Sequence, residues 1–168
     1  MGAHAGYYTL MCARLAKKVI AFEPNPVNYR FLYLNILLNR LKNVVAVKAA
    51  VSDFNGYGEL NIPYRMGKLL TSQGSLVRRG GKTVKVPVVT LDKIFGSIYP
   101  LQSFIIKIDV EGAELNVIKG ALEILSKGVK LVIIETHSIY AKNSIAELLK
   151  SINYRVFIKD RYLIARGN

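Results

Sequence analysis

Short apolar runs alternate with helical patterns along most of the chain. Apolar positions at helical spacing predict helices over residues 7–17, 26–41, 90–95, 112–126 and 139–151. The apolar runs predict strands over residues 18–22, 43–51, 103–108, 129–135, 154–158 and 162–166. This alternation is typical of an α/β protein with a mostly parallel sheet, and the polar turn Lys159-Asp160-Arg161 predicts that the last two strands form an antiparallel pair.

The pattern changes between residues 54 and 89. Two alternating runs, 59–62 and 83–89, flank four glycines, so this segment is predicted to be either an inserted ribbon or a loop. The length of the chain fits one domain, and we expect a single domain over residues 1–168.

The chain is strongly basic, with 24 Lys and Arg against 11 Asp and Glu, a net charge of +13. This charge favours an anionic partner, which leaves a nucleic acid open, or it serves only solubility. No acid lies between Leu60 and Leu91, so the basic residues there form either a solvated loop or a lid over an anionic substrate. They are Arg65, Lys68, Arg78, Arg79, Lys82 and Lys85.

The single cysteine and the length of the apolar runs indicate where in the cell the protein is found. Cys12 cannot form an intrachain disulfide, which fits a reducing compartment, and its place on an apolar helix face predicts that it is buried. No apolar run approaches the roughly 18 residues of a membrane-spanning helix. We therefore expect a cytoplasmic protein, and the sequence does not indicate its oligomeric state.

Carboxylates gather where a predicted strand ends. Asp109 and Glu111 follow the run 103–108, and ligands of open α/β sheets bind beyond the carboxyl ends of the strands. Neighbouring carboxylates raise each other's proton affinity, which suits a general base, although they could also bind a divalent cation. His137 follows the next strand and is either a partner in the same crevice or a solvated histidine.

A second group of residues could bind a nucleoside cofactor, although a glycine pair such as Gly2 and Gly6 is by itself more typical of a turn. Gly2-Ala3-His4-Ala5-Gly6 directly precedes a predicted helix, where small residues and free helix N–H groups let a ligand approach. Glu23 ends the strand 18–22 and could accept hydrogen bonds from ribose hydroxyls, or it is a loop or capping acid. Asp53 is either a turn residue before Asn55-Gly56 or an acceptor for an adenine amino group.

Six blocks together resemble the FkbM-type family of S-adenosylmethionine-dependent methyltransferases. They are Gly2 to Leu10, Phe22-Glu23-Pro24-Asn25-Pro26, Ala50-Val51-Ser52-Asp53, Val89-Thr90-Leu91-Asp92, Lys107 to Glu114, and Ile134-Glu135-Thr136-His137. The resemblance implies a class I methyltransferase fold and O-methylation of sugars or other small-molecule hydroxyls. The Asn/Asp-Pro-Pro-Tyr/Phe segment typical of amino-group methylation is absent, which favours oxygen as the acceptor atom.

The resemblance also implies which residues bind S-adenosylmethionine. It places Gly2, Ala3, His4 and Gly6 beside the methionine part, Glu23 on the ribose, and Ser52 and Asp53 near the adenine, with Asp109 completing the set. The family has a strand ending in an acid two residues before the first glycine. This chain begins at the glycine segment, so we expect its sheet to lack that strand.

We therefore expect an S-adenosylmethionine-dependent O-methyltransferase that acts on a small-molecule or glycan acceptor, and the net charge leaves an anionic acceptor open. Asp109, Glu111 or His137 would remove the acceptor proton, and no metal is expected because no fuller ligand set is evident. Two alternatives remain open. A truncated methyltransferase-like domain could act only as a binding module. A nicotinamide-dependent enzyme could also place Glu23 on a ribose, although its glycine spacing differs from Gly-x-x-x-Gly.

Overall fold

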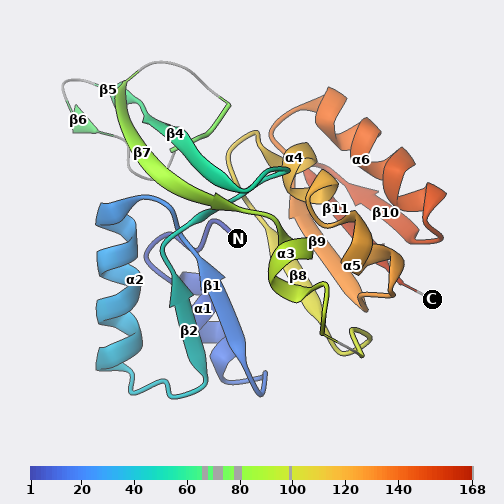
Figure 1. The fold of residues 1–168 in the computed structure, drawn as a ribbon, viewed down its shortest axis with the longest axis horizontal. Helices are drawn as coiled ribbons and strands as arrows, with labels where there is room; N and C mark the ends of the chain where they lie inside the picture. Colours follow the sequence, from blue (N-terminus) through green and yellow to red (C-terminus); the bar gives the residue numbers. More distant parts are fainter. Residues whose placement is uncertain (66–67, 70–73, 78–80, 99, 168) are drawn as a thin grey trace. The chain divides into compact units, whose positions relative to one another are not determined.

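The computed structural model describes residues 1–65, 68–69, 74–77, 81–98 and 100–167 (Figure 1). The chain divides into two compact units, of which the first comprises Met1–Ala50 and Gly56–Val88 and the second Val51–Asn55 and Val89–Asn168. None of the helices within the described ranges is long and apolar enough to cross a membrane.

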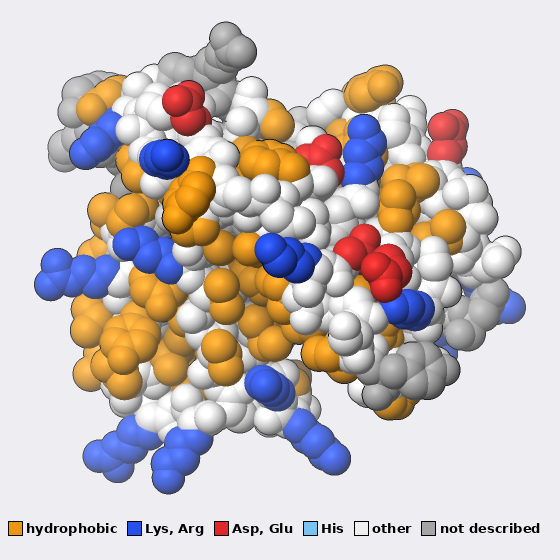
Figure 2. All heavy atoms as spheres, viewed as in Figure 1, with side chains coloured by type: hydrophobic (Ala, Val, Ile, Leu, Met, Phe, Trp, Pro, Cys, Tyr) orange, Lys and Arg blue, Asp and Glu red, His pale blue; other side chains and the backbone are white. Residues whose placement is uncertain are grey.

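The first unit opens with two helices and a parallel strand pair. These elements are α1 (Tyr7–Ala13), β1 (Val19–Phe22), α2 (Pro26–Leu38) and β2 (Val44–Val47). The side chain of Asn25 accepts a hydrogen bond from the Val27 N–H, and Pro26 occupies the first turn, so the chain starts α2 where the sequence predicts. Ala21, Leu32 and Ile36 form the buried cluster. Figure 2 shows further hydrophobic side chains over α2, β1 and β2, with Lys and Arg around them.

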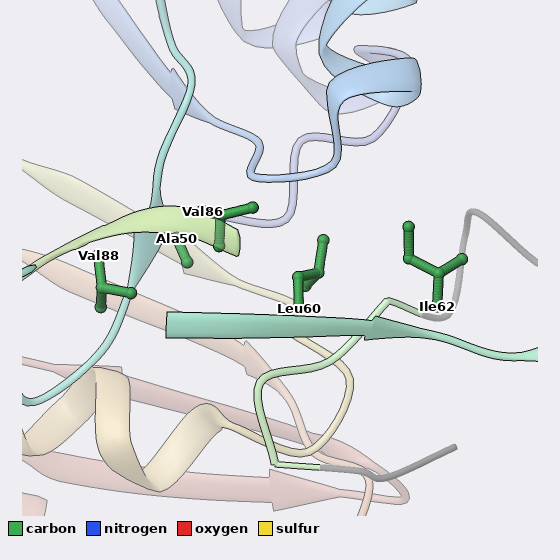
Figure 3. Packing of buried hydrophobic residues seen from close by; sticks show 5 residues of the cluster. All are labelled: Ala50, Leu60, Ile62, Val86 and Val88. Atoms are coloured by element: carbon green, nitrogen blue, oxygen red, sulfur yellow. The ribbon is translucent and has the colours of Figure 1, made fainter. Parts of the chain in front are cut away.

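The segment 54–89, for which the sequence left a ribbon or a loop open, forms an antiparallel ribbon. Its two long strands are β4 (Gly56–Ile62) and β7 (Lys82–Val89), with β3 (Ala50–Val51) beside β7 and a short pair, β5 (Tyr64–Arg65) and β6 (Lys68–Leu69). The side chains on one face of the ribbon are buried together (Figure 3), namely Ala50, Leu60, Ile62, Val86 and Val88. Of the predicted lid residues, Lys82 and Lys85 lie exposed on β7, whereas Arg78 and Arg79 lie outside the described residues.

The second unit contains one mixed sheet with the order β10-β11-β9-β8. Its elements are α3 (Leu91–Phe95), β8 (Ile105–Ile108), α4 (Glu114–Lys119), α5 (Leu122–Ser126), β9 (Leu131–Glu135), α6 (Ile139–Ser151), β10 (Arg155–Lys159) and β11 (Tyr162–Arg166). Because β8 and β9 are parallel neighbours, their carboxyl ends lie at the same edge of the sheet. β10 and β11 form the predicted antiparallel pair, and β11 pairs with β9.

Three local predictions were wrong. The predicted strand 43–51 is two strands, because β2 pairs with β1 and β3 pairs with β7. The predicted helix 112–126 is interrupted, and Gly120 ends α4. Cys12 is exposed, since the buried side chains of the short helix α1 are Thr9 and Ala13.

The interruption falls at a glycine that lies against another segment of the backbone. A Cβ atom added at Gly120 would overlap the carbonyl oxygen of Ser52, so this position requires glycine for close backbone approach. Helix propensity alone would suggest that Gly120→Ala stabilises the protein by up to about 1 kcal/mol. We expect the opposite, a loss of about 1–3 kcal/mol from overpacking, measured as a lower urea midpoint. A raised midpoint would contradict the close approach.

Candidate functional site

The turn after β8 carries the two predicted catalytic carboxylates. Glu111 and Gly112 both have left-handed backbone conformations, with φ values of 53° and 101°. This conformation is unfavourable for a residue with a side chain, and strained positions of this kind cluster at functional sites. Asp109 lies on the same turn, and the Lys107 Nζ is 2.9 Å from its Oδ2.

His137 is held by a carboxylate from α4. The His137 Nδ1 and the Glu114 Oε1 are 2.7 Å apart, and the same oxygen accepts a hydrogen bond from the Gly112 N–H. Glu114 is fully buried, and its second oxygen, Oε2, has no hydrogen-bond partner within the described parts of the chain. A carboxylate can only accept, so Nδ1 donates to Glu114, and in the neutral form of the imidazole the unprotonated nitrogen is Nε2.

The other ring nitrogen of His137 lies close to the β8 turn. The His137 Nε2 is 3.6 Å from the Glu111 Oε2. The hydrogen bond with Glu114 is the largest influence on His137 and raises its pKa above 6.5, against the opposing effect of burial. Glu111, Glu114 and Asp109 add to the increase through their charges. The structure therefore brings Asp109, Glu111 and His137 together, as the sequence predicts for strands that are neighbours.

Glu114 is the residue that sequence reasoning missed. The sequence suggested only a charge in the first turn of a helix, favoured by the helix dipole. A signal was present in the helical spacing, because Val117 and Ile118, three and four residues further, are apolar and fully buried. Glu114 therefore faces the protein interior, and it does so as the partner of a histidine.

The same site could in principle hold a divalent cation. Three potential ligand atoms lie within 4.8 Å of one another, one from each of Asp109, Glu135 and His137. Both carboxylates, however, already have cationic partners, since Lys107 contacts Asp109 and the Arg161 Nε is 3.1 Å from the Glu135 Oε1. A cation would have to displace these pairs, and the metal-free site stays our prediction.

The glycine segment of the first unit is anchored by Glu23. The His4 N–H donates to the Glu23 Oε2 at 2.7 Å, and the Asn25 N–H donates to Oε1 at 3.0 Å. Burial raises the pKa of Glu23, although these hydrogen bonds act in the opposite direction. Gly2, His4 and Gly6 all have positive φ, and a Cβ at Gly6 would crowd the Leu32 side chain.

These contacts bear on whether the Glu23 carboxylate can accept a hydrogen bond from a ribose hydroxyl. It is neither an exposed loop acid nor a charge on the first turn of α2, because it is buried and joins the glycine segment to the end of β1. A carboxylate has about four acceptor sites. The two N–H groups and the Asn28 side chain occupy three of these sites, which leaves one for a ribose hydroxyl, and the role of Glu23 stays a prediction.

Asp53 lies in the second unit and is held by its neighbours. Its Oδ2 accepts a hydrogen bond from the Asn116 Nδ2 at 2.9 Å, and its Oδ1 accepts one from the Ser52 Oγ at 3.0 Å. Burial raises the pKa of Asp53, but these hydrogen bonds and Lys119 together lower it below its usual value. Ser52 and Asp53 thus share a unit with Asp109, whereas Gly2, Ala3, His4, Gly6 and Glu23 belong to the first unit.

Comparison with known proteins gives consistent matches. Residues 1–158 match the model of the methyltransferase FkbM domain. The methyltransferase sdnD of Sordaria araneosa is 32% identical over 165 positions, which cover 80% of this chain and 64% of that protein. The crystal structure of methyltransferase FkbM from Methylobacillus flagellatus superposes with a TM-score of 0.70 and 17% identity, covering 98% of this chain and 41% of the other.

Two consequences follow from these matches. The structural match confirms the predicted α/β fold class, while the predicted lack of a first strand stays a prediction. The chain spans less than two thirds of the length of both proteins that it matches.

Proposed function

Because the chain belongs to the FkbM methyltransferase family, we propose that it catalyses the S-adenosylmethionine-dependent O-methylation of a sugar or another small-molecule hydroxyl. The observation that carries the proposal is the arrangement at the ends of β8 and β9. A buried carboxylate, Glu114, fixes the imidazole of His137 so that its basic nitrogen stands beside the Glu111 carboxylate.

The proposed chemistry needs a base beside the acceptor oxygen. When bound, S-adenosylmethionine supplies an electrophilic methyl group. Its C–S bond would break as the acceptor oxygen takes the methyl group, and S-adenosylhomocysteine would leave. The His137 Nε2 would accept the hydroxyl proton of the acceptor. Glu114 and Glu111 stabilise the resulting imidazolium through their negative charges. Much of the remaining acceleration comes from holding two reactants in line.

Each unit by itself contains residues that support the cofactor assignment. Support comes from the left-handed Gly2-to-Gly6 segment with its buried Glu23, and from Ser52, Asp53 and Asp109 in the second unit. The net charge of +13 remains compatible with an anionic acceptor. A solely binding function would leave the histidine and its buried carboxylate partner without a role.

Calorimetry with S-adenosylhomocysteine tests the cofactor assignment. We expect this product to bind, and NAD not to bind. Glu23→Gln should weaken binding about tenfold or more, because a charge-assisted hydrogen bond contributes about 1.5–3 kcal/mol. Glu59→Gln, which changes an exposed acid of β4 in the same unit, is the matched control and should bind normally.

Three results would contradict the proposal. NAD binding alone, or equal binding of both ligands, would favour a nicotinamide-dependent enzyme. Loss of binding in Glu59→Gln as large as in Glu23→Gln would assign the effect to net charge. Tight product binding without methyl transfer to any hydroxyl acceptor would favour the binding module.

A further inference from the structure

A hollow of about 420 Å³ opens beside the histidine of the proposed site. Three segments of the second unit form it: the end of β9, the first turns of α6, and the turn between β10 and β11. Its lining residues are Thr136, His137, Ser138, Ile139, Lys142, Asp160 and Arg161. An acceptor seated in this hollow would therefore lie against His137.

The backbone of the hollow is fixed by several hydrogen bonds. Thr136 donates twice to the Arg161 carbonyl, through its N–H and its Oγ1, both at 2.8 Å. The Ser138 side chain caps α6 by accepting from the Ala141 N–H. The chain therefore positions Arg161 and the start of α6 without help from a ligand, as a preorganised subsite requires.

Two of the lining side chains, Lys142 and Arg161, are cationic. The Nζ of the half-buried Lys142 donates to the backbone carbonyl of Asp160 at 3.0 Å, a contact that leaves its charge without a carboxylate partner in the described chain. Arg161 uses its Nε for Glu135, lies over the Tyr162 ring, and is 63% exposed. The first turn of α6 carries no acidic residue.

The lining also contains one apolar and one acidic side chain. Ile139 is 75% exposed and offers an apolar surface. Asp160 contributes a single negative charge, held in a turn with a φ of 52°. The hollow thus presents two cations, one anion and one apolar side chain, with a histidine among them.

We propose that this hollow is the acceptor subsite and that Lys142 and Arg161 select an acceptor that carries a carboxylate or phosphate group besides its hydroxyl. This proposal rests on the proposed function, since it takes His137 as the base. Arg161 suits a planar carboxylate or a phosphate through its fork of donors, and Lys142 adds a point charge. A neutral acceptor of the same size can accept hydrogen bonds from these side chains but lacks the charge–charge attraction.

Binding of simple probes to the nitrogen-labelled full chain tests the proposal without any methyl transfer. The probes are glucuronate, inorganic phosphate and neutral glucose, followed by amide shifts in NMR spectra. We expect glucuronate to shift the amides of His137, Ser138 and Arg161, and glucose to leave them in place. Phosphate distinguishes the two anion sources, because it shifts the same amides only if the cations accept a phosphate.

Charge variants then separate a built site from the general basicity of the chain. Lys142→Gln and Arg161→Gln should each weaken glucuronate binding about two- to fivefold, the range for one exposed charged contact. Lys150→Gln is the matched control, because Lys150 lies eight residues further along α6, about 12 Å away and beyond the Debye length of about 8 Å at physiological salt. Asp160→Asn should strengthen binding, because it removes the opposing charge.

The outcomes decide the proposal. Equal binding of glucuronate and glucose, shifts confined to other amides, or an equal loss in Lys150→Gln would overturn it. Calorimetry with S-adenosylhomocysteine on the same samples distinguishes a failure of the subsite proposal from a failure of the proposed function. Normal cofactor binding with no probe binding would reject the subsite alone, whereas absent cofactor binding would reject the proposed function.

Discussion

Replacing His137 with alanine is expected to lower kcat by about 10²–10⁴-fold, the usual cost of losing a general base. The base must be neutral, and the Glu114 hydrogen bond raises the pKa of His137 above 6.5. Activity of the wild-type protein should therefore rise with pH through a limb that lies above 6.5. Steady-state kinetics across pH should show this limb in the wild type and its loss in His137→Ala.

Variants of the neighbouring carboxylates provide the comparison with His137→Ala. Asp109→Asn and Glu111→Gln should also lower kcat, but the pH limb should remain because His137 is intact. A mild effect of His137→Ala, together with a collapse of activity in Glu111→Gln, would transfer the base role to the carboxylate. Loss of activity with EDTA and its return with Mg²⁺ would instead indicate a cation between Asp109, Glu135 and His137.

The order of the elements could be predicted from the sequence because each element carries its own periodicity. The run 162–166 and the helix 139–151 have the predicted bounds. The errors occur where contact with a segment distant in the sequence determines the bounds or the pairing of an element. Gly120 ends α4 at a point where the Ser52 carbonyl lies against it, and no pattern near Gly120 in the sequence records that approach.

The candidate site was predictable in part for the same reason. Asp109 and His137 each follow an apolar run, and parallel strands bring such ends together. The contact between Glu114 and His137 spans 23 residues and depends on how α4 packs. Whether the Arg78 and Arg79 segment covers an acceptor stays a prediction, since these residues lie outside the described ranges.

Glu114→Gln separates a positioning role from a purely structural one. The variant keeps the size of the side chain and an oxygen that can accept from the His137 Nδ1, but it removes the buried charge. The imidazolium loses its main stabilisation, so we expect the pKa of His137 to fall and the kinetic limb to move to lower pH. The kcat at the plateau should fall as well, because proton transfer to a weaker base is less favourable.

The pH dependence of stability gives an independent readout of the same contact. A pKa that is higher in the folded than in the unfolded state contributes stability that is fully present below about 6.5 and is lost as pH rises through the folded value. Urea unfolding of the wild type should show this loss of stability as pH rises. In Glu114→Gln, the free energy of unfolding should depend less steeply on pH. Glu147→Gln, an exposed acid of α6, should change neither the limb nor the slope. If Glu114 were only structural, its replacement would shift the urea midpoint equally at every pH and leave the kinetic limb in place.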